Sequence, residues 1–115
     1  MAPSAVAVEA STITPDHARA LGAAATERSL GFAEAPVVGS RPQADAGALV
    51  SLVGATDADL ARIQPVLETY SGAIRHTGPV GTAATMKLAI NGLFAMQVAA
   101  FAEIVGLLEL SLIHI

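Results

Sequence analysis

The sequence has no cysteine, and aromatic residues make up only 3% of its 115 residues. Without cysteine, neither a disulfide framework nor a thiolate zinc site can form. Its three histidines are far apart and pair with no carboxylate at metal-ligand spacing, so we expect no metal site. Alanine, valine, leucine and isoleucine must therefore fill the hydrophobic core.

Charge is also scarce. Charged residues account for 14% of the chain, and six Lys and Arg stand against ten Asp and Glu, for a net charge of −4. No basic stripe is present, so we expect no nucleic-acid surface. Hydrophobic residues make up 53%, which excludes a disordered segment and is high for a complete small soluble domain. The composition predicts one domain that is either membrane-associated or a buried piece of a larger protein.

The two ends of the chain carry separate signals. No basic segment precedes an apolar run at the N-terminus, so no signal peptide is predicted and the cytoplasm is the expected location. Residues 110–115 resemble the translation of a transposon end used in sequencing libraries. We expect them to be a non-native tail on a gene fragment; the other interpretation is an ordinary apolar helix end.

Short apolar runs alternate with segments of helical periodicity. Thr14 and Thr56 are suitable N-caps, each followed by acidic residues in a first helical turn. The alternation predicts an α/β fold with a parallel sheet and right-handed crossovers. The expected strands are 5–9, 31–37, 48–53 and 73–77, the expected loop is 39–47, and the expected helices are 15–29, 57–70 and one long helix from 82 to 109.

The last helix is apolar enough to raise the question of a membrane. Residues 88–102 carry no charge, and the length and hydrophobicity of the stretch 88–108 permit a membrane span. Against this, Asn91, Gln97 and Glu103 are six residues apart and therefore mark different faces. Much of the apolarity is alanine, and basic flanks are missing. We expect a helix buried by the rest of a larger protein; a small membrane-anchored protein is the alternative, which membrane fractionation would detect.

Lys87 is the only lysine in the chain, and it stands near the head of this apolar helix. Lys87 and Asn91 are four residues apart, so their side chains share one helical face. One interpretation is a solvated lysine on the first turns. The other is a proton donor and acceptor at a cleft, with the amide of Asn91 beside it to bind a substrate hydroxyl or carboxylate.

An ordered series of short motifs runs from residue 6 to residue 109. The motifs are Ser11-Thr12-x-x-Pro15, Ala35-Pro36-Val37-x-Gly39, Gly47-Ala48-Leu49, Leu52-Val53-Gly54, Pro65-x-Leu67, His76-x-Gly78-x-x-Gly81 and Lys87-Leu88-x-x-Asn91. In this order they resemble the β-hydroxyacid dehydrogenase family, which is related to 6-phosphogluconate dehydrogenase. The resemblance implies a partial Rossmann-type parallel sheet followed by one long interdomain helix. Residues 1–81 would then be the C-terminal part of an NAD(P)-binding domain, and residues 82–109 the start of a helical C-terminal domain.

The resemblance also implies roles for individual residues. Thr12 matches the position beside the nicotinamide ribose, and Gly39 with Ser40 matches a loop that holds the substrate carboxylate. Lys87 matches the catalytic lysine and Asn91 the asparagine that orients the substrate. The implied reaction is hydride transfer between NAD or NADP and a small 3-hydroxy acid or its semialdehyde. The implied whole protein is a homo-oligomer that binds a small-molecule substrate, with no membrane and no nucleic acid.

Three positions depart from the family pattern. Val38 replaces the usual serine of the substrate loop, Ser40 its second glycine, and Ala83 a common glycine before the lysine. A valine donates no hydrogen bond, so an imine or another non-hydroxyacid substrate is an alternative.

No Gly-x-Gly-x-x-Gly occurs, so the sequence does not separate NAD from NADP, and this polypeptide alone is expected to be inactive. A non-catalytic module with a cofactor fold is a further alternative, which the Lys87–Asn91 pair disfavours.

Overall fold

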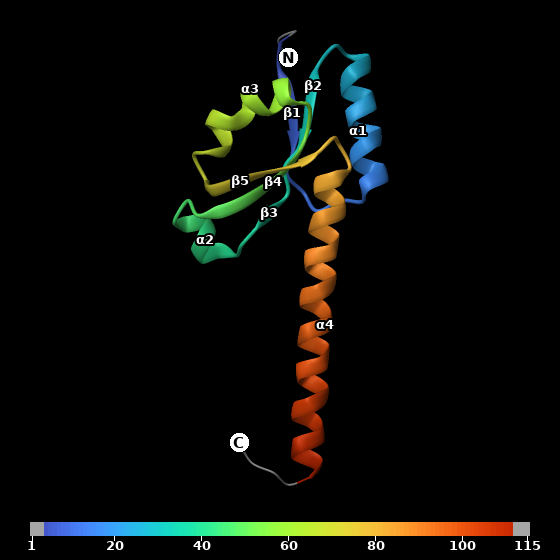
Figure 1. The fold of residues 1–115 in the computed structure, drawn as a ribbon, viewed down its shortest axis with the longest axis vertical. Coiled ribbons are helices and arrows are strands. Elements are labelled where there is room, and N and C mark those ends of the chain that lie inside the picture. Colours follow the sequence, from blue (N-terminus) through green and yellow to red (C-terminus); the bar gives the residue numbers. More distant parts are fainter. Residues whose placement is uncertain (1–3, 112–115) are drawn as a thin grey trace.

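Residues 4–111 are described by a computed structural model, in which helices cover a small sheet and one long helix leaves it at one end (Figure 1). The predicted alternation of strands and helices is confirmed, and three helices start at the predicted residues 15, 57 and 82. In chain order the elements of this range are β1 (Val6–Glu9), α1 (Pro15–Glu27), β2 (Gly31–Glu34), β3 (Val37–Val38), α2 (Arg41–Asp45), β4 (Leu49–Gly54), α3 (Asp57–Leu67), β5 (Ser71–Gly78) and α4 (Thr82–Leu110).

The sheet contains two parallel strand pairs joined by an antiparallel junction. β1 runs parallel to β2, and β4 runs parallel to β5. β2 and β3 lie end to end along the other edge of β4, antiparallel to it and in one continuous register, with Glu34 opposite Gly54. Pro36 separates them because it has no N–H to donate, although its carbonyl still accepts the N–H of Leu52 at 2.9 Å.

The prediction of a parallel sheet is therefore confirmed for two pairs and corrected at the junction. A parallel pair needs a crossover of a dozen or more residues, which the segments containing α1 and α3 provide. Residues 39–48 between β3 and β4 are too few, so the chain turns back antiparallel. This segment, predicted as a loop, also contains the short helix α2, in which Pro42 occupies a favourable early helical position.

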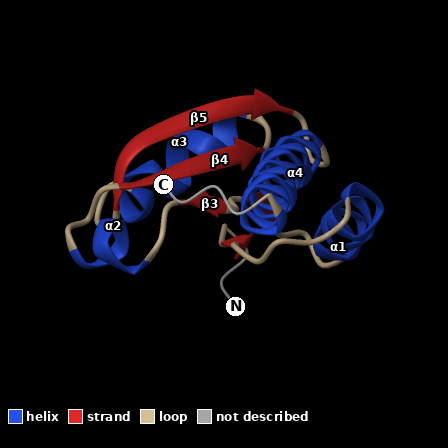
Figure 2. Cartoon of the chain, turned by 90° about the horizontal axis from the view of Figure 1, so that it is seen from below, coloured by secondary structure: helices blue, strands red, loops and turns tan. Residues whose placement is uncertain are grey.

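Helices lie on both faces of the sheet (Figure 2). On one face, α3 packs against the strands, and Ile63 and Leu67 join Val53 in the hydrophobic core. On the other face, α1 and the first turns of α4 lie side by side and contact β2 and β4 respectively. Phe32 projects to this second face, against Gly22 of α1. Alanines make up much of the core, as the composition predicts.

The helix caps follow the sequence, while two helix ends come earlier than predicted. The hydroxyls of Thr14 and Thr56 each accept the N–H three residues later at 3.2 Å, which confirms both N-caps. α1 stops at residue 27 rather than 29, because Ser29 takes a left-handed φ of +57°. α3 stops at residue 67 rather than 70, two residues after the helix-disfavouring Pro65.

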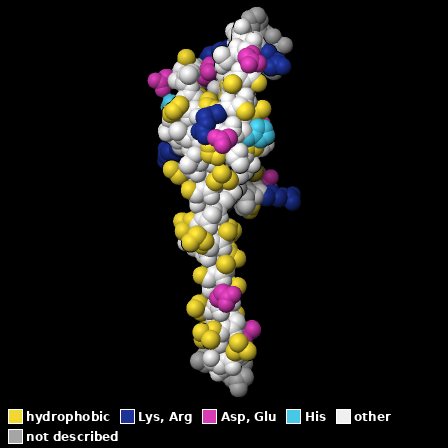
Figure 3. Space-filling model, turned by 90° about the vertical axis from the view of Figure 1, so that its right-hand side faces the viewer, with side chains coloured by type: hydrophobic (Ala, Val, Ile, Leu, Met, Phe, Trp, Pro, Cys, Tyr) yellow, Lys and Arg dark blue, Asp and Glu magenta, His cyan; other side chains and the backbone are white. Residues whose placement is uncertain are grey.

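Most of α4 projects beyond the sheet and is exposed to solvent (Figures 1 and 3). Only Ala83 and Ala84 in its first turn are buried, whereas Phe94 and Phe101 are 67% and 72% exposed. By length and composition α4 could cross a membrane, with a mean hydropathy of 1.8 over 18 residues, none of them buried. The burial expected for this helix is thus not supplied by residues 4–111. Of the predicted non-native tail, Leu110 ends α4, Ser111 is its C-cap, and 112–115 lie outside the described residues.

Candidate active site

Thr12 lies just past the carboxyl end of β1, in the loop that leads into α1. Before it, Oε1 of Glu9 accepts the N–H of Ser11 at 2.7 Å, which turns the chain away from the strand. Hydrogen bonds from the Ser11 hydroxyl and then from its N–H hold the pKa of Glu9 below the usual 4.5. Thr12 itself is exposed, so its hydroxyl is open to a ligand at this edge of the sheet.

Replacing Glu9 with glutamine should lower the melting temperature slightly near neutral pH and progressively less in acid. The folded-state pKa is depressed, so the stabilisation is fully present above pH 4.5 and is lost as the pH falls through the folded-state pKa. A solvated carboxylate of this kind contributes less than about 1 kcal/mol. Thermal unfolding of both proteins across this pH range tests it, with Glu27→Gln in an exposed helical position as the control. A difference that does not change with pH would contradict this prediction.

Gly39 and Ser40 follow β3 and lead into α2. Gly39 has a φ of +129°, which favours glycine, and a Cβ there would lie 2.8 Å from Cδ2 of Leu49. The N–H and the hydroxyl of Ser40 both donate to Oε1 of Gln43, each at 2.9 Å. The backbone at Gly39 is therefore exposed in a defined conformation, while the hydroxyl of Ser40 already donates its hydrogen bond to Gln43 within the loop.

Lys87 continues the buried face of the first turns of α4. Ala83 and Ala84 are buried against the sheet, and Lys87 follows them by four and three residues, so its side chain projects on the same side. Lys87 is partly buried and forms no ion pair within residues 4–111. Asn91, four residues further along this face, is exposed. The two side chains are thus presented on one face just beyond the end of the sheet.

A carboxylate that the sequence analysis missed holds the start of α4. Glu34, the last residue of β2, is 1% exposed, and its Oε1 accepts the N–H groups of Gly81 at 2.7 Å and Ala83 at 2.8 Å. Gly81 is the N-cap of α4, at a φ of +102°, and has no side chain with which to cap the helix. The signal in the sequence was one acidic residue in an otherwise apolar strand, because a buried carboxylate needs donors.

The segments that carry the predicted site residues meet at one end of the sheet. Figure 1 shows the β1–α1 loop, β3 and the first turns of α4 on the same side, towards which β1 and β2 run. This end presents a hydroxyl from the β1–α1 loop, exposed backbone groups after β3, and an ammonium and an amide from α4. Such groups can bind a small anion and exchange a proton with it. Within the described part of the chain, no three His, Cys, Asp or Glu residues are grouped so that they could hold a metal ion.

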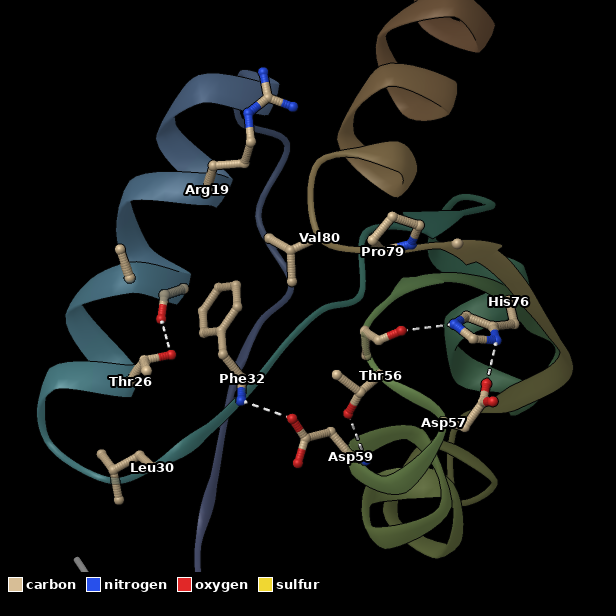
Figure 4. Close-up of a pocket in the computed structure, with 14 residues that line it drawn as sticks. Arg19, Thr26, Leu30, Phe32, Thr56, Asp57, Asp59, His76, Pro79 and Val80 are labelled. Carbon is tan, nitrogen blue, oxygen red and sulfur yellow. Dashed lines mark hydrogen bonds and ion pairs between the residues drawn. The ribbon is translucent and has the colours of Figure 1, made fainter.

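A separate pocket of about 640 Å³ lies between α1, the start of α3 and the end of β5 (Figure 4). Its lining includes apolar Phe32 and Val80 and polar Asp57 and His76. Nε2 of His76 donates to the carbonyl of Ala55 at 2.8 Å, and its Nδ1 lies 3.6 Å from Oδ1 of Asp57. None of the predicted site residues lines this pocket. The predicted site residues therefore lie outside this open pocket, at the end of the sheet.

Comparison with known sequences identifies related proteins. The family described as the NAD binding domain of 6-phosphogluconate dehydrogenase matches residues 1–78. The chain is 37% identical over 107 residues to the NAD-dependent L-serine dehydrogenase of Pseudomonas aeruginosa, and 34% identical over 98 residues to the 2-(hydroxymethyl)glutarate dehydrogenase of Eubacterium barkeri. These matches cover 93% and 85% of the chain but only 36% and 33% of the relatives. The chain spans about a third of the length of these relatives.

Solved structures give the same pattern. The 3-hydroxyisobutyrate dehydrogenase of Mycobacterium tuberculosis with L-serine is 34% identical, with a TM-score of 0.87 over 94% of the chain and 37% of that protein. The 3-hydroxyisobutyrate dehydrogenase of Salmonella typhimurium is 27% identical, with a TM-score of 0.90 over 98% of the chain and 40% of that protein. An imine reductase of Myxococcus stipitatus with NADP⁺ is 22% identical at a TM-score of 0.73, which shows a shared fold alone.

Proposed function

The chain belongs to the family of the NAD-binding domain of 6-phosphogluconate dehydrogenase, and from this we propose the activity of the protein that carries it. That protein is an NAD- or NADP-dependent oxidoreductase that transfers hydride between the nicotinamide and a small 3-hydroxy acid or its semialdehyde. The observation that carries the proposal is the meeting of the Thr12 loop, the Gly39 loop and the Lys87 face at one end of the sheet. A relative named for L-serine supports the substrate class, because serine is itself a 3-hydroxy acid.

The residues at this end fit the nicotinamide half of a dinucleotide. In open α/β sheets, ligands bind outside the carboxyl ends of the strands, and Thr12 lies there between β1 and the N-terminus of α1. Its exposed hydroxyl suits contact with a ribose. When bound, NAD or NADP supplies the hydride acceptor. The glycine-rich turn that would hold the pyrophosphate and distinguish the two cofactors is not among these residues.

The other residues act on the substrate. In the oxidation direction, the amine of Lys87 accepts the proton of the substrate hydroxyl, and in reduction its ammonium returns that proton. The amide of Asn91, on the same face of α4, orients the substrate by hydrogen bonding. The backbone at Gly39 binds the substrate carboxylate, together with Ser40 once its donors turn from Gln43 to the substrate. These contacts position the reacting carbon, while the cofactor carries out the redox step.

The free edge of the sheet supports the proposed domain organisation. β1 pairs with β2 alone among the described strands, and apolar hollows of about 390 and 250 Å³ lie beside β1, lined by residues of α3 and of α1 respectively. Further strands with their helices would fill both hollows. These hollows support the proposal that residues 1–81 are the C-terminal part of a larger dinucleotide-binding domain. In the same proposal, 82–109 begin a helical domain and 110–115 are a non-native tail. The whole protein is a cytoplasmic homo-oligomer in this proposal.

A second candidate activity is the reduction of an imine. It is favoured by Val38, because its side chain offers no hydroxyl to a substrate carboxylate at the position before Gly39. Membrane anchoring through α4 is favoured only by the length and composition of that helix. The attachment of its first turn to the sheet favours a connecting role instead.

The test of the proposal is a substrate screen on the full-length protein that carries this chain. We expect reduction of NAD or NADP with short 3-hydroxy acids, including 3-hydroxyisobutyrate and L-serine, and no turnover of the matched 2-hydroxy acids. Fluorescence of the reduced nicotinamide measures the rates. Turnover of imines without turnover of 3-hydroxy acids would support the second candidate. A protein that uses neither class would contradict both, and membrane fractionation would then test the anchoring alternative.

A further inference from the structure

We propose that Glu34 is a positioning residue that fixes the direction in which α4 presents Lys87. The proposal rests on the proposed function, because it assigns Glu34 an effect on the reaction through the proposed catalytic lysine. Glu34 itself belongs to β2 and is buried, so it touches neither substrate nor cofactor.

One carboxylate ties the start of α4 to β2, while a 2.8 Å hydrogen bond between the hydroxyls of Thr77 and Thr82 ties it to β5. Oε1 of Glu34 accepts the N–H groups of Gly81 and Ala83, and both of these residues are buried. Glycine at the N-cap supplies no side-chain acceptor of its own, so without Glu34 these donors would be buried without a partner. Oε2 of Glu34 is also buried and has no partner within residues 4–111, so one oxygen makes both contacts.

The strand beside Glu34 is shaped to admit its side chain. Gly54 lies opposite Glu34 in the register between β2 and β4. A Cβ at residue 54 would overlap Oε1 of Glu34 and would lie 2.8 Å from its Cγ. The carboxylate therefore occupies space that an ordinary residue at position 54 would fill, and its position is closely confined.

The hydrogen bonds of Glu34 lie at the first turn of α4, where they control the orientation of Lys87. Ala83 and Ala84 are the only buried residues of α4, so the helix is packed against the sheet at its first turn and has no buried residue after it. Lys87 follows Ala83 by four residues, or about 6 Å along the helix axis. Because an α-helix is stiff over this distance, a tilt or rotation at the first turn is carried directly to the Lys87 ammonium. The negative charge of Glu34 also stabilises the positive end of the helix dipole.

A double-mutant cycle in the full-length protein tests the proposal. Glu34→Gln keeps the shape of the side chain and removes its charge; we expect kcat to fall by about tenfold to a hundredfold, as for a misplacement of the order of 1 Å. The KM for the dinucleotide should stay unchanged. In a Lys87→Ala background, Glu34→Gln should have no further effect on kcat, because its effect passes through the lysine. Thr56→Ala, which removes the N-cap of α3, is the matched control and should leave kcat unchanged.

The outcomes separate this inference from the proposed function. If Glu34→Gln lowers kcat equally in both backgrounds, or leaves it unchanged in the wild type, Glu34 does not position Lys87 and the inference is overturned. If Lys87→Ala keeps full kcat, the proposed role of Lys87 fails, and the inference fails with it. Should Glu34→Gln not fold, the cycle is run with Glu34→Asp, which keeps the charge one methylene shorter and should give a smaller loss with the same dependence on Lys87.

A measurement independent of activity checks the contact itself. Amide hydrogen exchange of Gly81 and Ala83 should be much faster in Glu34→Ala, which removes the acceptor oxygen, than in the wild type, and unchanged in Thr56→Ala. Equal protection of these two amides in all three proteins would show that the carboxylate does not hold the helix, and would overturn the inference whatever the kinetics.

Discussion

Replacing Lys87 with alanine in the full-length protein should lower kcat by about 10²- to 10⁴-fold, the usual contribution of a general acid–base group. The binding of NAD or NADP should be unaffected, because Lys87 is proposed to exchange a proton with the substrate, whereas Thr12 of the β1–α1 loop is proposed to contact the cofactor. Steady-state kinetics with a 3-hydroxy acid gives kcat, and fluorescence titration with the reduced dinucleotide gives the affinity.

Two further variants show whether the proton of Lys87 matters. Lys87→Arg should lose nearly as much activity as the alanine variant, because a guanidinium does not release its proton near neutral pH. Met86→Ala, at a neighbouring exposed position of the same helix, should keep the wild-type rate. A near-normal kcat for Lys87→Arg would show that residue 87 serves only as a positive charge for binding, and the proposed mechanism would be wrong.

Replacing Phe101 with glutamate should leave the stability of the short chain nearly unchanged and strongly destabilise the full-length protein. In the chain of 115 residues Phe101 is 72% exposed, so the free energy of unfolding should change by less than about 0.5 kcal/mol. If a helical domain covers α4 in the full-length protein, the same change buries an unpaired charge and should cost about 3–5 kcal/mol. Urea unfolding of both proteins with and without the substitution measures the two effects.

The control for this comparison is Ala61→Glu, at an exposed position of α3, which should be nearly neutral in both proteins. A harmless Phe101→Glu in the full-length protein would mean that this face of α4 remains in solvent there. The proposal that residues 82–109 begin a packed helical domain would then be abandoned.

The helices were predictable because their signals are local. Thr14 and Thr56 cap the helices that follow them through contacts only three residues long, and the structure shows both caps. The family was also predictable, since a series of individually weak motifs in a fixed order is specific; the match over residues 1–78 confirms it. The spacing of Lys87 and Asn91 placed both residues on one face once the helix was assigned, while their chemical roles stay predictions.

The features that were missed depend on contacts between distant parts of the chain. Glu34 meets Gly81 and Ala83, which follow it by 47 and 49 residues, and no local pattern pairs them. The antiparallel pairing of β3 and β4 could have been predicted from the sequence, because the connection between them is too short for a crossover. The regular alternation of elements suggested a uniform parallel sheet and obscured that length argument.

The Glu34 side chain occupies the space that a side chain at position 54 would need, and this limits the order in which mutations can accumulate. A side chain at position 54 collides with the carboxylate, so residue 34 must first become smaller. A smaller residue 34 leaves the N–H groups of Gly81 and Ala83 without an acceptor, and a capping side chain at position 81 would replace that acceptor for Ala83 alone. At position 81 that side chain would meet the guanidinium of Arg19 and would have to adopt a φ of +102°. Each single step is unfavourable alone, so positions 34, 54 and 81 are expected to change together in descendants of this sequence or to stay as they are.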